Sequence, residues 1–237
     1  MRHSIWLAAG MVVICACSDP PPSQGTPDAS SDVKPDKLVD QRDASDAEIK
    51  GCRPADVSSF SPSWVPPKPA SAACTEQTIA QYANDCLDPA TRSTTACTAF
   101  QTANKSCVAC LVTPESASSY GAAISRSNGV ISLNVGGCIA LLSGDLSPAG
   151  CGGKYDANRQ CAAASCDDVC AIPDGDDPAF QAYLKCVSDS AKTTCKSYAA
   201  AVCAEADAGA VAACSLNGAS FVDNFKALAP IFCASGG

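Results

Sequence analysis

The chain has 237 residues, of which 18 are cysteine and 1 is histidine, with 16 basic and 24 acidic side chains. The only histidine, His3, lies in the predicted export signal, so the mature chain would have no Ser-His-Asp or Cys-His catalytic set and no His-ligated metal site. The net charge of −8 argues against nucleic-acid binding, which needs concentrated Lys and Arg to displace phosphate counterions.

Residues 1–16 are predicted to form a signal peptide. Arg2 gives a positive start, and residues 5–15 form an apolar run that is too short to span a bilayer as a helix. The following Ile14-Cys15-Ala16-Cys17 resembles the lipobox of bacterial lipoproteins, in which the last cysteine is diacylated and becomes the new N-terminus. We therefore expect a lipid on Cys17; the alternative is ordinary cleavage after Ala16, which would leave Cys17 as a plain thiol.

Residues 17–50 are predicted to be the lipidated cysteine followed by a disordered acidic tether. From residue 18 onward the segment is rich in Pro, Ser and Asp, with eight acidic and four basic side chains and almost no large apolar groups. Such a segment cannot bury enough apolar surface to offset the entropy lost on ordering. We expect it to link a membrane-bound lipid to a folded domain.

The folded domain is expected over residues 51–237, and disulfides are expected to hold it together. Setting aside Cys15 in the signal and Cys17 at the lipid leaves sixteen of the 18 cysteines, an even number typical of complete pairing in an exported chain. The domain has few large aliphatic residues, so cross-links must make up for a thin apolar core. The predicted disulfide cysteines are Cys52, Cys74, Cys86, Cys97, Cys107, Cys110, Cys138, Cys151, Cys161, Cys166, Cys170, Cys186, Cys195, Cys203, Cys214 and Cys233.

Two other interpretations of these cysteines stay open. Cys107 and Cys110 have the C-x-x-C spacing of thiol redox sites, but Cys107 is expected late in a helix, whereas a thioredoxin-like site begins a helix at its first cysteine. Zinc or iron–sulfur binding needs thiolates, which an oxidising compartment does not preserve. We expect Cys107 and Cys110, like Cys166 and Cys170, to present their sulfurs to two neighbouring helices.

Residues 51–73 form a proline-rich lead-in to the domain. Its five prolines forbid regular helix. We expect the lead-in to be ordered, held by Cys52 and by apolar contacts of Phe60 and Trp64. A further stretch of linker, or a proline-rich ligand for a partner's aromatic groove, are the alternatives.

Helical periodicity begins after Cys74. The first predicted helix covers residues 75–87, with Thr75 as its N-cap and Asp88-Pro89 as its end. A second is expected over 90–112 and a third over 115–125. A turn at Asn128-Gly129 leads to a short strand within 130–135 and a buried helix at 138–142. Glycines at positions 150, 152 and 153 predict a break.

The C-terminal third is predicted to be helical over residues 155–170, 178–187, 193–205 and 220–228. A turn at 173–175 and an Asp177 cap before Pro178 separate the first two helices. Cys195, Cys203 and Cys214 have a spacing that returns to one side of a helix, with a break at 207–209. The predicted fold class is all-α: a disulfide-stapled bundle of short helices with long loops and at most one small β element.

Several of these segments together resemble a group of cysteine-rich bacterial lipoproteins of uncharacterised function. The segments are Cys52, Trp64-Val-Pro-Pro, Ala73-Cys-Thr, Cys86-Leu-Asp-Pro, Cys107-Val-Ala-Cys110, Asn134-Val-Gly-Gly-Cys-Ile and the Cys166 and Cys170 pair. The resemblance covers nearly all of residues 51–237. It implies an exported, lipidated and disulfide-rich protein and implies no catalytic activity.

Two arrangements of carboxylates could form sites. Asp174, Asp176 and Asp177, with Asp167 and Asp168 nearby, could bind Ca²⁺ through oxygen, but their spacing matches no EF-hand loop, and caps and turns explain them better. A paired-carboxylate glycosidase is a further possibility, although sugar sites recruit aromatic residues and the folded region has one tryptophan. We therefore predict no catalytic residue, no metal site and no cofactor.

The function predicted from sequence is a lipid-anchored protein of the cell envelope, not an enzyme, acting as a binding or surface structural module. Its predicted partner is the outer membrane of a Gram-negative cell, reached through the N-terminal lipid, since Ser rather than Asp follows Cys17. The ligand, protein or small molecule, is left open. The first alternative is an exported enzyme using carboxylates or a Ser/Lys pair, and the second is a thiol-disulfide redox protein.

Overall fold

The computed structural model describes residues 52–127, 129–170, 178–198, 203 and 207–234. The predicted signal peptide, Cys17, the tether, the turn at 173–175 and the Asp177 cap lie outside the described residues. The described chain is mostly helical with one three-stranded sheet. The prediction of a largely helical, disulfide-rich fold with one small β element is therefore confirmed, although the sheet makes "all-α" too narrow a class.

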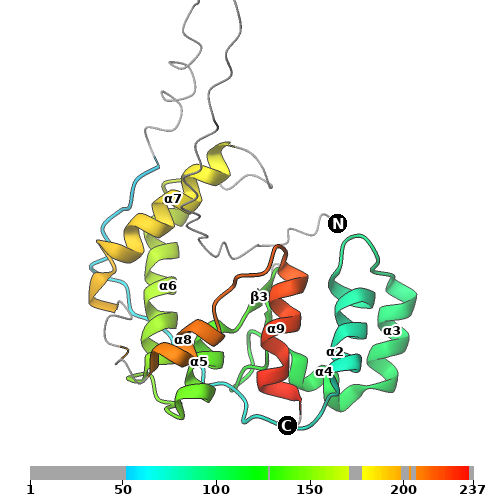
Figure 1. Ribbon diagram of the computed structural model, residues 1–237. Coiled ribbons are helices and arrows are strands. Elements are labelled where there is room, and N and C mark those ends of the chain that lie inside the picture. The colour runs from blue at the N-terminus through cyan, green and yellow to red at the C-terminus, as the bar shows by residue number, and fades with distance from the viewer. Residues whose placement is uncertain (1–51, 128, 171–177, 199–202, 204–206, 235–237) are drawn as a thin grey trace, which may run out of the picture.

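The elements follow one another in chain order, with η1 a π-helix and η2 a 3₁₀ helix. They are α2 (Glu76–Tyr82), η1 (Ala83–Leu87), α3 (Thr94–Ala103), α4 (Lys105–Leu111), β1 (Val112–Pro114), β2 (Ala123–Ser125), β3 (Ile131–Leu133), α5 (Val135–Ser143), α6 (Cys151–Asp167), α7 (Pro178–Lys192), η2 (Lys196–Tyr198), α8 (Ala208–Ala213) and α9 (Phe221–Cys233). Figure 1 shows α6 and α7 on one side of the molecule, α2, α3 and α4 on the other, and α5, α8 and α9 between them.

The first helix begins where its cap was predicted. The Thr75 hydroxyl accepts a hydrogen bond from the Thr78 amide, and the Thr78 hydroxyl accepts one from the Thr75 amide in return, so a capping box starts α2. After Tyr82 the helix continues as η1 and ends before Asp88. The predicted range of 75–87 is therefore one helical segment, but its second half is wider than an α-helix.

The predicted helix over 90–112 is wrong as a single element. Residues 89–91 form a turn in which the Ala90 amide donates to Asp88, and α3 starts at Thr94 behind the Ser93 cap. The backbone then leaves helical geometry at Asn104, which separates α3 from α4. The Asn104 side-chain amide donates to the Phe100 carbonyl 3.1 Å away, and this bond stabilises the end of α3.

The predicted helix over 115–125 is also wrong. The chain forms β2 there, which pairs in parallel with β1 and antiparallel with β3. Tyr120 exchanges backbone hydrogen bonds with the lead-in, at 2.9 Å to Pro66 and 2.7 Å from Lys68, so its peptide groups are not available to a helix. The strand predicted within 130–135 is β3.

The short buried helix predicted at 138–142 is α5, and it starts earlier than expected, at Val135. Its cap is Asn134, whose side-chain oxygen accepts from the Gly137 amide at 2.9 Å and whose side-chain nitrogen donates to the Gly121 carbonyl at 3.0 Å. A single buried asparagine therefore both begins α5 and fixes it to the chain before β2.

Glycine lets α5 and α6 approach closely. A Cβ placed on Gly152 would overlap the Gly136 carbonyl oxygen and would lie 2.7 Å from Ala140 Cβ. The predicted break at positions 150, 152 and 153 is wrong for the last two glycines, because α6 begins at Cys151 with Gly150 as its N-cap. The reason is packing, since only glycine at position 152 fits the contact between the two helices.

The predicted helix over 193–205 is wrong where the structure describes it. Residues 193–195 form a turn, η2 follows, and residues 199–202 and 204–206 lie outside the described residues. Asn158 of α6 donates to the Ala191 and Cys195 carbonyls at 3.0 and 3.1 Å, so it satisfies carbonyls at the end of α7. Cys195, Cys203 and Cys214 therefore do not share one helix.

The final helix begins at the predicted cap and runs further than predicted. The Ser220 hydroxyl accepts from the Asp223 amide at 3.1 Å, and α9 continues past Pro230 to Cys233 rather than ending near residue 228. Its buried face includes Phe225, Leu228 and Phe232. Within the described residues, no helix is both long and apolar enough to cross a membrane.

The close contact between α5 and α6 generates the first prediction. In Gly152→Ala the added methyl overlaps the backbone of α5, and overpacking of this kind typically costs about 1–3 kcal/mol. We expect the free energy of unfolding, measured by denaturant titration of the oxidised protein, to fall by about 2 kcal/mol.

The matched control is Gly209→Ala in α8, where an added Cβ meets nothing within 4 Å. Because alanine favours helix over glycine, this variant should gain about 0.5–1 kcal/mol. Equal effects of the two substitutions would contradict the packing argument.

Candidate functional site

All sixteen cysteines from Cys52 onward are paired, in eight disulfides. Seven of them join separate parts of the fold, and one, Cys86–Cys97, joins η1 to the neighbouring α3. The pairs are Cys52–Cys170, Cys74–Cys107, Cys86–Cys97, Cys110–Cys233, Cys138–Cys214, Cys151–Cys203, Cys161–Cys195 and Cys166–Cys186.

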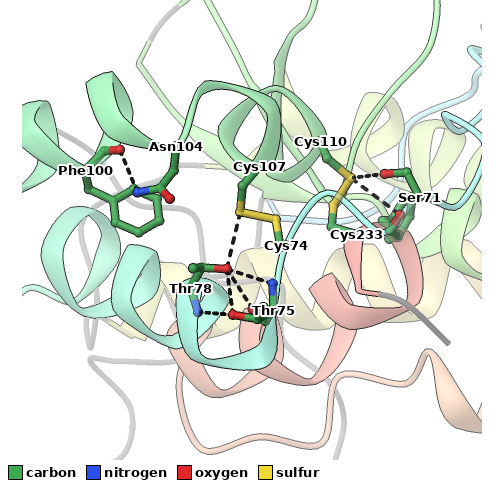
Figure 2. The surroundings of a disulfide bond; sticks show 10 residues. Ser71, Cys74, Thr75, Thr78, Phe100, Asn104, Cys107, Cys110 and Cys233 are labelled. Carbon is green, nitrogen blue, oxygen red and sulfur yellow. Dashed lines mark hydrogen bonds between the residues drawn. A yellow bond between two sulfur atoms is a disulfide. The ribbon is translucent and has the colours of Figure 1, made fainter. Parts of the chain in front are cut away.

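The two C-x-x-C cysteines are bonded to different partners and not to each other. Figure 2 shows Cys107 bonded to Cys74, just before α2, and Cys110 bonded to Cys233 at the end of α9. Cys107 lies near the start of the short helix α4, so its predicted place late in a helix is wrong, because α3 ends at Asn104. The C-x-x-C spacing therefore lets two cysteines of α4 form disulfides with two different segments of the chain.

Three sulfurs come together at the end of α6. The sulfurs of Cys52, Cys170 and Cys186 lie within 4.8 Å of one another. A metal ion would need them as thiolates, but each is bonded to another sulfur, in Cys52–Cys170 and Cys166–Cys186. The cluster is therefore two disulfides side by side, and only one partner of each pair, Cys166 or Cys170, comes from the C-x-x-x-C motif.

The lead-in lies against the helices. Besides the Cys52 bond, the Ala55 amide donates to the Ser165 carbonyl of α6 at 2.8 Å. The Phe60 ring packs edge-on against Tyr198, with the ring centroids 5.9 Å apart. The Trp64 indole N–H donates to the Leu146 carbonyl at 3.0 Å. Phe60 thus makes the apolar contact expected of it, whereas Trp64 is held by a hydrogen bond.

The carboxylates considered above as possible calcium ligands are only partly described. Asp167 accepts a hydrogen bond from the Tyr183 hydroxyl at 2.9 Å. Burial raises the pKa of Asp167, and burial together with the hydrogen bond to Asp167 raises the pKa of Tyr183. Asp174, Asp176 and Asp177 lie outside the described residues. Asp167 therefore has a structural partner, a tyrosine on α7.

A groove between α3, η1, β3 and the start of α9 is the candidate binding site. It has a volume of about 420 Å³, within the range of small-molecule sites. It is lined by Asp85, Cys86, Leu87, Arg92, Ser93, Thr94, Cys97, Thr98, Gly129, Ile131 and Phe221. Hydroxyl, carboxylate, guanidinium and sulfur groups therefore meet an apolar floor, a mixture suited to a small polar ligand.

The π-helix shapes one wall of this groove. Elements of this kind are rare and recur at functional sites. Asp85 in η1 accepts a 3.3 Å hydrogen bond from Gln81, and its carbonyl accepts the Ser93 amide at 3.0 Å. Lys226 of α9 donates to the Asn84 side chain at 2.9 Å. Hydrogen bonds from Gln81, Ser93 and Lys226 therefore fix this wall of the groove.

Sequence reasoning missed the groove. The buried residues Ile79, Tyr82, Ala83 and Leu87 recur at the spacing of an ordinary α-helix, so the sequence carries no signal for the π-helix. Eight of the eleven lining residues come from 85–98, and only the tertiary fold brings Gly129, Ile131 and Phe221 beside them.

The fold and its cross-links define a disulfide-rich, mostly helical protein of the kind found in oxidising, exported environments. Comparison with known proteins gives no match among family models, curated proteins or solved structures. The resemblance to cysteine-rich bacterial lipoproteins therefore stays a prediction from the sequence.

Asp156, half-buried on α6, generates a pH-dependent prediction. Gln160 donates to its carboxylate at 2.7 Å and also binds the lead-in at Ser63. Burial raises the pKa of Asp156 more than that hydrogen bond lowers it. A raised carboxyl pKa means that wild-type stability is lost as the pH rises through that pKa. We expect Asp156→Asn to be more stable than wild type at pH 7, with the gap closing below about pH 4.

The control is Asp189→Asn on the exposed side of α7, where the carboxylate makes a surface ion pair with Lys185. Such pairs contribute little to stability. Thermal melts from pH 3 to 8 give the comparison; a stability gap for Asp156→Asn that widens toward acid pH would contradict the assignment.

Proposed function

We propose that this chain is a lipid-anchored protein of the cell envelope whose helical domain is a non-enzymatic binding or structural module. The observation that supports this most directly is the complete pairing of sixteen cysteines. Each such bond typically contributes about 2–4 kcal/mol by restricting the unfolded chain. A domain cross-linked in this way stays folded in an oxidising compartment outside the cytosol.

The cross-links also favour binding. The groove walls come from η1 and α3, which the Cys86–Cys97 bond joins, and from α9, which Cys110–Cys233 ties to α4. A wall held before the ligand arrives loses little conformational entropy on binding. The proposed role therefore needs only a preformed groove and no chemical step.

The anchor in this proposal is a diacylated Cys17 at the outer membrane. Two acyl chains hold a protein at a bilayer far more firmly than one. The 33 residues from 18 to 50 would behave as a flexible chain with a typical end-to-end distance of roughly 30 Å. The domain would then bind its ligand away from the membrane surface, at a restricted distance.

Intact mass spectrometry of the full chain made in a Gram-negative host tests the anchor and the cross-links together. We expect the mature mass to correspond to cleavage after Ala16 plus lipid, and reduction to add two hydrogens for each of eight bonds. The control is Cys17→Ala, which should lack the lipid mass and leave the membrane fraction. A wild-type chain without lipid would refute the anchor.

Full reduction is expected to unfold the domain, beginning with α6 and α7. The buried cluster between these helices consists of Cys166, Cys170, Tyr183 and Cys186, and the apolar residues packed against it, Phe180, Leu184 and Val187, are only partly buried. In excess dithiothreitol, hydrogen exchange should rise first in α6 and α7, and the helical circular dichroism signal should then be lost. Oxidised dithiothreitol is the control. A melting curve that is the same with and without the reductant would contradict the proposed role of the bonds.

A further inference from the structure

The eight disulfides differ in how far their sulfurs are shielded. In seven of the bonds of the described chain at least one cysteine is buried, and in most of these both are. In Cys86–Cys97 neither cysteine is buried. Thiol–disulfide exchange requires that an external thiolate reach a sulfur along the bond axis, so access decides which bond reacts first.

Cys86–Cys97 is also the bond that lies in the groove. Both of its cysteines line the groove, beside Asp85 and Arg92. A volume of about 420 Å³ admits a small molecule and its solvent, but not the body of a folded protein. Compounds that reach this bond inside the groove are therefore small thiols.

Breaking this bond leaves the surrounding fold supported. The bond closes a loop of only 11 residues, whereas Cys52–Cys170 and Cys110–Cys233 span 118 and 123. A short loop restricts the unfolded chain least. The helix α3 also keeps its buried Phe100, whose ring lies 5.7 Å from that of Tyr82 between centroids.

We propose that Cys86–Cys97 is a redox-exchange site within the groove, reduced by low-molecular-weight thiols while the other seven bonds stay closed. This goes beyond the proposed binding role, because it assigns a covalent reaction to the groove. Its opening would remove the covalent link between η1 and α3, two walls of the same cavity that a ligand would occupy.

The reaction is an ordinary two-step exchange. A thiolate of a small dithiol attacks one sulfur of the pair, forming a mixed disulfide, and the electron pair of the broken bond leaves with the other cysteine as its thiolate. The second thiol of the reductant then displaces the first cysteine. The protein gains two electrons and two protons as Cys86 and Cys97 thiols, and the reductant becomes a cyclic disulfide.

The test is limited reduction of the oxidised full chain with dithiothreitol, followed by alkylation and peptide mapping. We expect Cys86 and Cys97 to be labelled about tenfold faster than any other cysteine, with the helical circular dichroism signal unchanged at that stage. The proposal is overturned if another pair is labelled first, or if thiols appear only as the helical signal is lost.

A double variant, Cys86→Ser with Cys97→Ser, should keep the helical signal and lose the fast phase of labelling. The matched control is Cys151→Ser with Cys203→Ser, which removes a bond with one partly exposed cysteine and should keep the fast phase. If the first variant fails to fold, mapping of the wild-type chain still decides, because order of labelling is measured there directly.

Discussion

The sulfur–sulfur bond is the interaction on which this structure depends. The largest fully buried side chains are Phe225, Phe232, Ile79, Leu111, Ile139, Val135, Cys138, Cys161, Cys166, Cys195, Cys214 and Cys233. Half of that set is therefore cysteine. Here the bond is both the covalent link between distant segments and a large share of what fills the interior, so apolar packing and cross-linking are not separate contributions.

The two sides of the molecule use this interaction to different degrees. The main core, between α2, α4, α5 and α9, still contains phenylalanine, leucine and isoleucine beside its cysteines. Between α6 and α7 the buried contacts are disulfides, small residues and a hydrogen bond between the hydroxyls of Ser165 and Ser190, both fully buried. The larger apolar residues Phe180, Leu184 and Val187 pack beside these contacts but are only partly buried, so restriction of the unfolded chain supplies a larger share of the stability here than in the main core.

Elements that depend on local hydrogen bonds could be predicted from the sequence, whereas elements that depend on long-range contacts could not. Thr75 and Ser220 act as caps because their hydroxyls lie three residues before a free amide, a relation contained in the sequence itself. The strand at 123–125 forms because the preceding Tyr120 pairs with the lead-in more than 50 residues earlier, which no local pattern records. The choice of disulfide partners could not be predicted for the same reason. The even number of cysteines predicted that they pair, but the partner of Cys110 is 123 residues away.

The groove, which the sequence did not predict, is explained by the way the fold protects its disulfides. A protein that depends on disulfides must keep them from exchanging with one another or with outside thiols, and burial does this for most of its bonds. Cys86–Cys97 differs from the others, since Cys86 of the π-helix packs against the main core and also lines the groove. Because α3 has its own anchor in Phe100, the fold does not need this bond buried. Cys86–Cys97 is thus the bond on which the fold depends least, and it is also the bond that small thiols can reach.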